Sequence, residues 1–302
     1  MKKYIILSNW IENYLAQEHY FFAKYLENFG WKIIKLNKFK KNNNLLLDKD
    51  KNFILFFTYD GYNIENYKSK INNNTTIIYK LDDLYPKKNI RKQCILNADI
   101  IIGPYQYLYN KVYPIIESKK TFHIPYSAVN NFYNDILFNE NPIKKIFVSG
   151  ACDKEIYPFR HFIKNEKIFE KYIEKLEHPG YSNFSHKCIN KKYYLKLNSF
   201  LCCFVDASAY TYILLKVFET CSVGSLLLVC ESIKDELNKL GFYDNKNCIM
   251  CNKNNVLKKI EWIFDNEIKV NKIRKNGMNL VQKNHNTKKR AELFDTYIKN
   301  LM

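Results

Sequence analysis

The stretch "YTYILLKVFETCSVGSLLLVC", residues 210–230, joins a helical pattern to an almost wholly apolar strand. We predict a helix over residues 211–221, followed by a buried strand at "SLLLVC". In such a helix Tyr212, Lys216 and Glu219 share one face, because side chains three or four residues apart are neighbours.

The same alternation of apolar runs and amphipathic segments extends on both sides of this stretch, which predicts an α/β fold. Residues 1–130 contain six apolar runs, and a second series follows a stretch rich in Asn over 131–142. We expect an N-terminal Rossmann-like domain over 1–130, a linker over 131–142 and a second Rossmann-like domain over 143–285. The second domain includes a predicted helix over 166–176. The last segment, 286–302, has apolar residues at helical spacing, and we expect it to cross back to the first domain.

Composition bounds the class of protein. The chain has 302 residues, 47% of them hydrophobic, which is typical of a globular protein. No apolar run reaches the roughly 18 residues that span a bilayer, so we expect a cytoplasmic protein. Nine scattered cysteines fit free thiols in a reducing compartment, and "CIMC", residues 248–251, is interpreted as a short strand rather than a metal or redox site.

The net charge of +18 comes mainly from lysines that are spread along the whole chain. We interpret it as a solvated basic surface. A peripheral contact with an anionic membrane stays open as an alternative. No nucleic-acid motif is present, so we expect no specific nucleic-acid partner.

Two doubly wound domains would bind a ligand in the cleft where they face each other, at the carboxyl ends of the strands. The glycine pattern of a dinucleotide site and the P-loop are both absent. The second domain instead offers Gly150 at the end of a strand, Arg160 ten residues on, and the helix with Lys216 and Glu219.

The segment that begins "LLKVFETCSVGSLLLVC" and continues to "NHNTKKRAELF" resembles the C-terminal domain of group 1, CgeB-like glycosyltransferases of the GT-B fold. The similarity rests on Lys216, Glu219, Gly224, the Leu240–Gly241 turn, and His285 with Thr287. It covers about 90 residues. The first domain resembles that of the family only in its predicted order of strands and helices. The segment "IPYSAVNNFY" is similar to the one that connects the N-terminal domain of these enzymes to the next domain.

The resemblance implies a nucleotide-sugar donor site. Glu219 would hold the ribose hydroxyls, while Lys216 and Arg160 would face the diphosphate or donor sugar. The other donor-binding candidates are Gly150, Ser208, Tyr212 and His178. Fixed positive charge would stabilise the leaving group without a metal, so we expect no metal ligand and no cofactor beyond the donor itself. Many retaining members carry a second glutamate where this chain has Thr211, which leaves the stereochemistry open.

Three aspartates are the catalytic candidates. Asp82 and Asp83 in "KLDDLYP" resemble an acidic pair of CgeB-like chains, and Asp60 in "TYDGY" is a rival. A carboxylate facing the acceptor hydroxyl could act as a general base. The structural alternative is that Asp82 and Asp83 cap the next helix.

Other readings of these residues remain open. Lys216 and Glu219 could form a surface ion pair, and Arg160 could be solvated. Asp48 and Asp50 have the D-x-D form that binds a metal in GT-A enzymes, although the C-terminal half does not fit that fold. We therefore predict a metal-independent glycosyltransferase that acts on a glycan, lipid-linked or protein-linked acceptor. The alternatives are a nucleotide-sugar 2-epimerase and a non-catalytic protein that binds nucleotide sugars or anionic surfaces.

Overall fold

The computed structural model describes residues 2–13, 17–41, 52–57, 64–67, 71–85, 87–180 and 188–301. Contacts divide the chain into two compact units. The first comprises Met1–Tyr126 together with Thr287–Met302, and the second comprises Ser127–Asn286. Residues 131–142, the expected linker, fall within the second unit. The first unit is therefore discontinuous in sequence.

The first unit contains a six-stranded parallel sheet in the order β2-β1-β3-β4-β5-β6. Each strand is one of the apolar runs recognised in the sequence, because a strand covered on both faces needs a continuous apolar run. The strands are β1 (Lys2–Leu7), β2 (Trp31–Lys35), β3 (Asn52–Phe57), β4 (Thr75–Lys80), β5 (Ile100–Gly103) and β6 (Lys120–His123).

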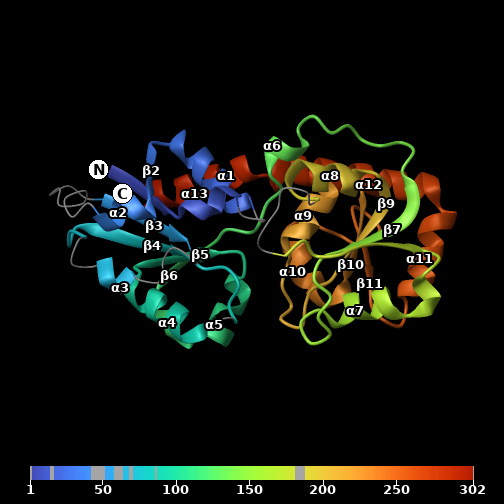
Figure 1. Ribbon diagram of the computed structural model, residues 1–302, viewed down its shortest axis with the longest axis horizontal. Helices are drawn as coiled ribbons and strands as arrows, with labels where there is room; N and C mark the ends of the chain where they lie inside the picture. The colour runs from blue at the N-terminus through green and yellow to red at the C-terminus, as the bar shows by residue number, and fades with distance from the viewer. Residues whose placement is uncertain are drawn as a thin grey trace. The chain divides into compact units, whose positions relative to one another are not determined.

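Helices cover both faces of this sheet (Figure 1). They are α1 (Glu18–Glu27), α2 (Leu36–Lys41), α3 (Ile64–Tyr67), α4 (Lys88–Asn97), α5 (Tyr109–Val112) and α13 (Thr287–Lys299). The terminal helix α13 packs on α1, and its Phe294 lies 5.7 Å from the Phe22 ring and 5.3 Å from the Trp31 ring. The predicted return of the C-terminal helix to the first unit is confirmed.

The second unit contains a five-stranded parallel sheet in the order β11-β10-β9-β7-β8. Its strands are β7 (Ile143–Ser149), β8 (Ile173–Leu176), β9 (Phe200–Val205), β10 (Leu226–Cys230) and β11 (Ile249–Cys251). The segment "CIMC" thus contributes the predicted short strand, β11. The helices are α6 (Asn130–Tyr133), α7 (Pro158–Asn165), α8 (Asn190–Asn198), α9 (Leu215–Ser222), α10 (Lys234–Lys239), α11 (Val256–Asp265) and α12 (Glu267–Asn284).

Two predicted helices of this unit are wrong in position. The helix lies earlier in the chain than predicted: α7 has Pro158 as its first residue and ends at Asn165. Residues 166–176, predicted to be helical, contain a short 3-10 turn followed by β8. The predicted helix over 211–221 begins at Leu215. Ser208 and Thr211 have φ of 59° and 57°, a left-handed backbone that no right-handed helix contains, so the segment before Leu215 is a loop.

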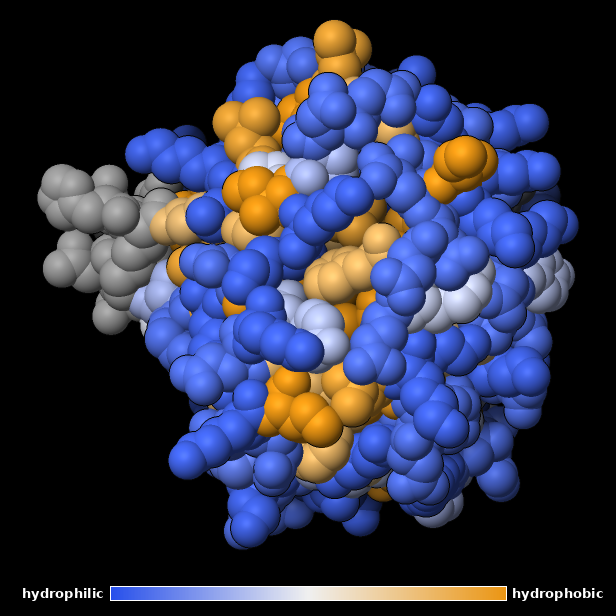
Figure 2. Space-filling view, turned by 90° about the vertical axis from the view of Figure 1, so that its right-hand side faces the viewer, coloured by the Kyte–Doolittle hydropathy of each residue, from blue (hydrophilic) through white to orange (hydrophobic). Residues whose placement is uncertain are grey.

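The exposed surface of the described residues is mostly hydrophilic. Figure 2 shows hydrophobic residues as separate groups among hydrophilic ones on the face that it views. Among the described residues, no helix has both the length and the apolar character needed to cross a bilayer.

Candidate functional site

The carboxyl edge of the second sheet brings several predicted site residues together. Strands β7 and β9 are parallel neighbours, so the residues that follow them, Gly150 and Asp206, lie at the same edge. Helices α7 and α9 supply Arg160 and Lys216 to this edge. The sequence therefore places two basic side chains where open α/β sheets bind ligands.

Gly150 lies between the two basic side chains. Its φ is +100°, and a Cβ built there would lie 3.1 Å from Lys216 Cε and 3.2 Å from Arg160 Nη1. Both distances are shorter than an ordinary contact. A glycine thus allows the backbone to adopt this conformation while both side chains lie against it.

Lys216 lies in the first turn of α9, and its ammonium group is held by two hydroxyl groups. It donates to Tyr193 Oη at 2.8 Å and to Ser149 Oγ at 3.3 Å. The two hydroxyl oxygens are 2.7 Å apart. Burial lowers the pKa of Lys216 to about 8, the charge of Glu219 opposes that fall, and the charge of Arg160 adds to it.

Arg160 is buried, with 1% of its surface exposed, so the reading of a solvated surface residue is wrong. Its Nη1 donates to the carbonyl oxygen of Ala151 at 2.7 Å, and its guanidinium lies 4.3 Å from the Tyr157 ring centre. Burial lowers its pKa, which the charge of Asp206 opposes.

Two further donor atoms of the Arg160 guanidinium are buried. Its buried Nε and Nη2 have no hydrogen-bond partner among the described residues. A buried donor without a partner costs roughly 1–3 kcal/mol. Such a group in a folded protein calls for an explanation, and a bound anion is one.

Glu219 is half-buried on α9, one turn after Lys216. Burial raises its pKa, and the charge of Lys216 opposes the rise. Helix α9 packs on α8, and the charge of Glu219 contributes to the raised pKa of Tyr193 and of Tyr194 on that helix. Among the ion pairs of the described residues none joins Lys216 to Glu219, so the surface ion pair is wrong.

The remaining donor-side candidates lie in loops. Tyr212 is buried before α9, and its N–H donates to the Ala207 carbonyl at 2.7 Å, so it does not share a helix face with Lys216. Ser208 follows β9, and its Oγ accepts from the N–H of Tyr210 at 3.1 Å. His178 follows β8, and its Nδ1 accepts from the N–H of Gly180 at 2.9 Å.

In the first unit, Asp82 and Asp83 follow β4. Asp82 is buried and its Oδ2 lies 2.8 Å from His19 Nε2. Asp83 has φ of 35°; burial and the charge of Asp82 raise its pKa to about 6, against the charge of Arg91. Neither is the N-cap of α4, because the N-cap residue is Lys87, whose φ is 51°. Asp60, Asp48 and Asp50 lie outside the described residues.

A buried charged cluster around Asp82 was not predicted from the sequence. His19 Nδ1 lies 2.9 Å from Lys80 Nζ and 3.2 Å from Glu18 Oε2. Burial and Lys80 lower the pKa of His19, but hydrogen bonds to Asp82 and Glu18 outweigh them and the pKa is raised. The sequence feature that could have indicated this cluster is Lys80, a charged residue at the end of an otherwise apolar run.

Within the described parts of the chain, no group of three or more His, Cys, Asp or Glu side chains is placed to hold a metal ion. The nine cysteines are free thiols, and burial raises the pKa of several, including Cys202 and Cys251.

Solved structures identify the architecture. A sucrose-phosphate synthase from Thermosynechococcus elongatus aligns with 100% of this chain and 99% of its own, with a TM-score of 0.68 at 11% identity. The fold is that of the GT-B glycosyltransferases. HepE from Anabaena in complex with UDP-glucose aligns over 99% of this chain and 100% of its own, with a TM-score of 0.65 at 8% identity.

A third solved structure, a glycosyltransferase from Rickettsia africae, aligns over 99% of this chain and 98% of its own, with a TM-score of 0.60 at 11% identity. No family model matches the sequence, and no curated protein matches it significantly. The likeness is therefore one of fold.

Proposed function

We propose that the protein is a glycosyltransferase that moves a sugar from a nucleoside-diphosphate sugar to an acceptor hydroxyl group. The observation that carries this proposal is the convergence of Arg160 and Lys216 on Gly150, at the carboxyl edge of the second sheet. The HepE structure with UDP-glucose supports the same donor class, because it has the same fold.

The two basic side chains suit a diphosphate. Transfer breaks the bond between the sugar's anomeric carbon and the diphosphate oxygen, and the electron pair stays with the diphosphate. The guanidinium charge of Arg160 and the ammonium of Lys216 would stabilise that negative charge. Because both charges belong to the protein, we propose that the reaction needs no metal ion.

Glu219 would bind the ribose of the donor. A carboxylate accepts hydrogen bonds from two neighbouring hydroxyl groups, and Glu219 stands one turn of α9 beyond Lys216. Its oxygens would replace the hydration of the ribose hydroxyls. Ser208, Tyr212 and His178, in the loops of the same unit, remain candidates for shaping the donor site.

The first unit would supply the general base. The acceptor hydroxyl must lose a proton when its oxygen bonds to the anomeric carbon. Asp83, with a pKa of about 6, is ionised at pH 7 and is a stronger base than an ordinary carboxylate. Asp82, held by His19, is the rival for this role.

Calorimetry of wild type and Arg160→Lys with UDP, GDP, dTDP and CMP tests the donor site. We expect one nucleotide to bind wild type most tightly. Lysine keeps the charge of Arg160 but loses its planar set of donors, so binding should weaken at least tenfold. Lys239→Gln, an exposed lysine on α10, is the control. Equal affinities for wild type and Arg160→Lys would overturn the proposed site.

Product analysis tests the reaction itself. Incubation of the donor with glycan, lipid-linked and protein-linked acceptors, with and without EDTA, should give a glycosylated product at similar rates. A product inverted at C2 from donor alone would identify a 2-epimerase instead. Donor binding without turnover on any acceptor would favour the non-catalytic alternative.

A further inference from the structure

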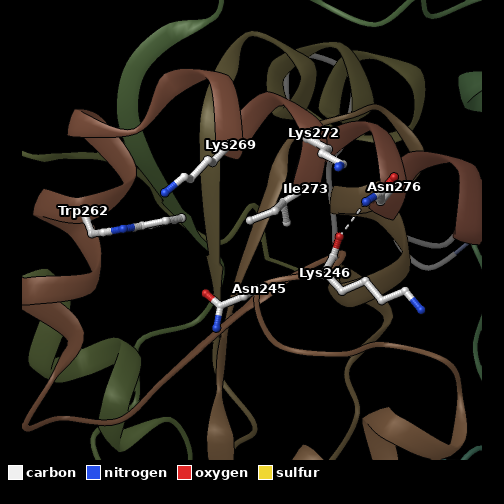
Figure 3. Close-up of a pocket in the computed structure, with 7 residues that line it drawn as sticks. All are labelled: Asn245, Lys246, Trp262, Lys269, Lys272, Ile273 and Asn276. Carbon is white, nitrogen blue, oxygen red and sulfur yellow. Dashed lines mark hydrogen bonds between the residues drawn. The ribbon is translucent and has the colours of Figure 1, made fainter.

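A pocket opens at the edge of the second unit's sheet opposite to Gly150. It has a volume of about 460 Å³ and lies between the loop before β11, helix α11 and the first half of α12 (Figure 3). The strands are parallel, so the loop before β11 lies at their amino edge, whereas Gly150 lies at their carboxyl edge. The pocket is therefore separate from the proposed donor site.

A hydrogen bond joins the two walls of the pocket. Asn276 Nδ2 on α12 donates to the carbonyl oxygen of Lys246 in the loop at 2.9 Å. Gly277 lets α12 approach this loop, because a Cβ there would lie 2.7 Å from the Asn247 carbonyl oxygen. Asn247 also braces the loop through its donation to the Gly241 carbonyl at 2.8 Å. The pocket is thus preformed rather than created by a ligand.

Two lysines border the pocket without an ion-pair partner among the described residues. Lys269 and Lys272 are exposed on α12, and no carboxylate of the described residues lies within ion-pair distance of either. Two nearby carboxylates have other partners: Glu267 pairs with Lys144, and Asp244 with Lys259. The ammonium groups of Lys269 and Lys272 can therefore attract an anion to the pocket.

The rest of the lining combines an aromatic ring with hydrogen-bond acceptors. Figure 3 shows Trp262 at one end, Ile273 between the two lysines, and Asn245 and Asn276 from opposite walls. The amide nitrogen of Asn276 is bonded to Lys246, and that of Asn245 to Asp244. The amide oxygen of Asn276 points away from the loop, whereas that of Asn245 lies on the side of Trp262, where it can accept from a hydroxyl group (Figure 3).

We propose that this pocket binds an anionic sugar, that is, a sugar bearing a phosphate or carboxylate group. The ring face packs on the Trp262 indole, a hydroxyl group donates to Asn245, and the acidic group binds the Lys269 ammonium, which extends toward Trp262 (Figure 3). The proposal does not depend on the proposed transferase activity.

Calorimetric titration with glucose 1-phosphate, glucuronate, glucose and inorganic phosphate tests it. At least one of the two anionic sugars should bind at least tenfold more tightly than either glucose or phosphate. Whichever of glucose 1-phosphate and glucuronate binds more tightly shows whether the preferred acidic group is a phosphate or a carboxylate. Phosphate binding as tightly as both sugars would reduce the pocket to a plain anion site and overturn the proposal, as would binding of neither sugar.

Variants locate the binding. Lys269→Gln with Lys272→Gln should weaken binding at least tenfold, and Trp262→Leu should remove any ligand-dependent change in tryptophan fluorescence. The control, Lys258→Gln with Lys283→Gln, alters the same number of exposed lysines on α11 and α12 and should change binding less than twofold. Equal loss in both double variants would indicate general surface charge and contradict the proposal.

The donor site is the remaining competitor for a sugar phosphate. Lys216→Gln alters only the carboxyl edge and should leave the anionic-sugar affinity unchanged. Loss of binding in this variant would place the ligand at the donor site and overturn the inference.

Discussion

Lys216 gives the proposed donor site a specific pH dependence. Its pKa of about 8 means that the ammonium loses its proton within the range where most proteins are stable. The diphosphate's own charge is constant above pH 7, because the second pKa of a phosphate is about 6. Nucleoside diphosphate affinity should therefore fall about tenfold from pH 7 to pH 9. Calorimetry across this range checks it, and Lys216→Gln should bind weakly with a flat profile.

Asp83 should destabilise the fold at neutral pH. Its folded pKa of about 6 lies above the ordinary value of 3.8, so ionisation opposes folding once the pH exceeds 3.8, and fully above 6. Asp83→Asn removes this cost and suits the φ of 35°. We expect a gain of ~1–3 kcal/mol at pH 7.5 that is mostly lost at pH 4. Urea unfolding at both pH values measures it, with exposed Glu117→Gln as control; a pH-independent gain would contradict the assignment.

Helix α13 should contribute strongly to the stability of the first unit. Phe294 is fully buried against Phe22 and Trp31, and Asp295 accepts from Lys3 at 2.7 Å. Phe294→Ala should cost about 3–5 kcal/mol, because it leaves a cavity in this core. Thr296→Ala, at an exposed position on the same helix, should cost less than ~0.5 kcal/mol. Denaturant unfolding compares them, and similar losses would contradict the packing.

The strands could be predicted from the sequence, whereas helix starts could not. A strand such as β9 is an uninterrupted apolar run, and its burial follows from that run alone. The start of α9 depends on the backbone at Ser208 and Thr211, and neither Ser nor Thr signals a left-handed conformation. The strand β8 has two exposed residues in its middle, which makes it resemble a helix turn.

Part of the candidate site could likewise be predicted from the sequence and part could not. Lys216 and Glu219 stand three residues apart on the helix expected from the sequence, and Lys216 lies beside Gly150. The contact between His19 and Asp82 joins residues 63 positions apart on two elements, and no local pattern encodes it. The unpaired donors of Arg160 likewise depend on burial that only the folded chain has.

Removal of residues 287–302 should affect the two units differently. The first unit would lose the helix that covers Phe22 and Trp31, while the second unit, Ser127–Asn286, would keep all of its strands. Hydrogen exchange should rise in α1, β1 and β2 and stay unchanged in β9 and β10. Equal protection of β1 in the full and shortened chains would contradict this expectation.

The discontinuity of the first unit also affects how the chain folds as it is made. During translation the six strands of the first unit are synthesised first, and the second unit follows. Helix α13, which belongs to the first unit, is synthesised after the second unit. The second unit is continuous, so its core needs no segment from outside Ser127–Asn286. The part translated first is therefore the part that finishes folding last. During that interval, the apolar face that α13 later covers is the surface on which a chaperone would act.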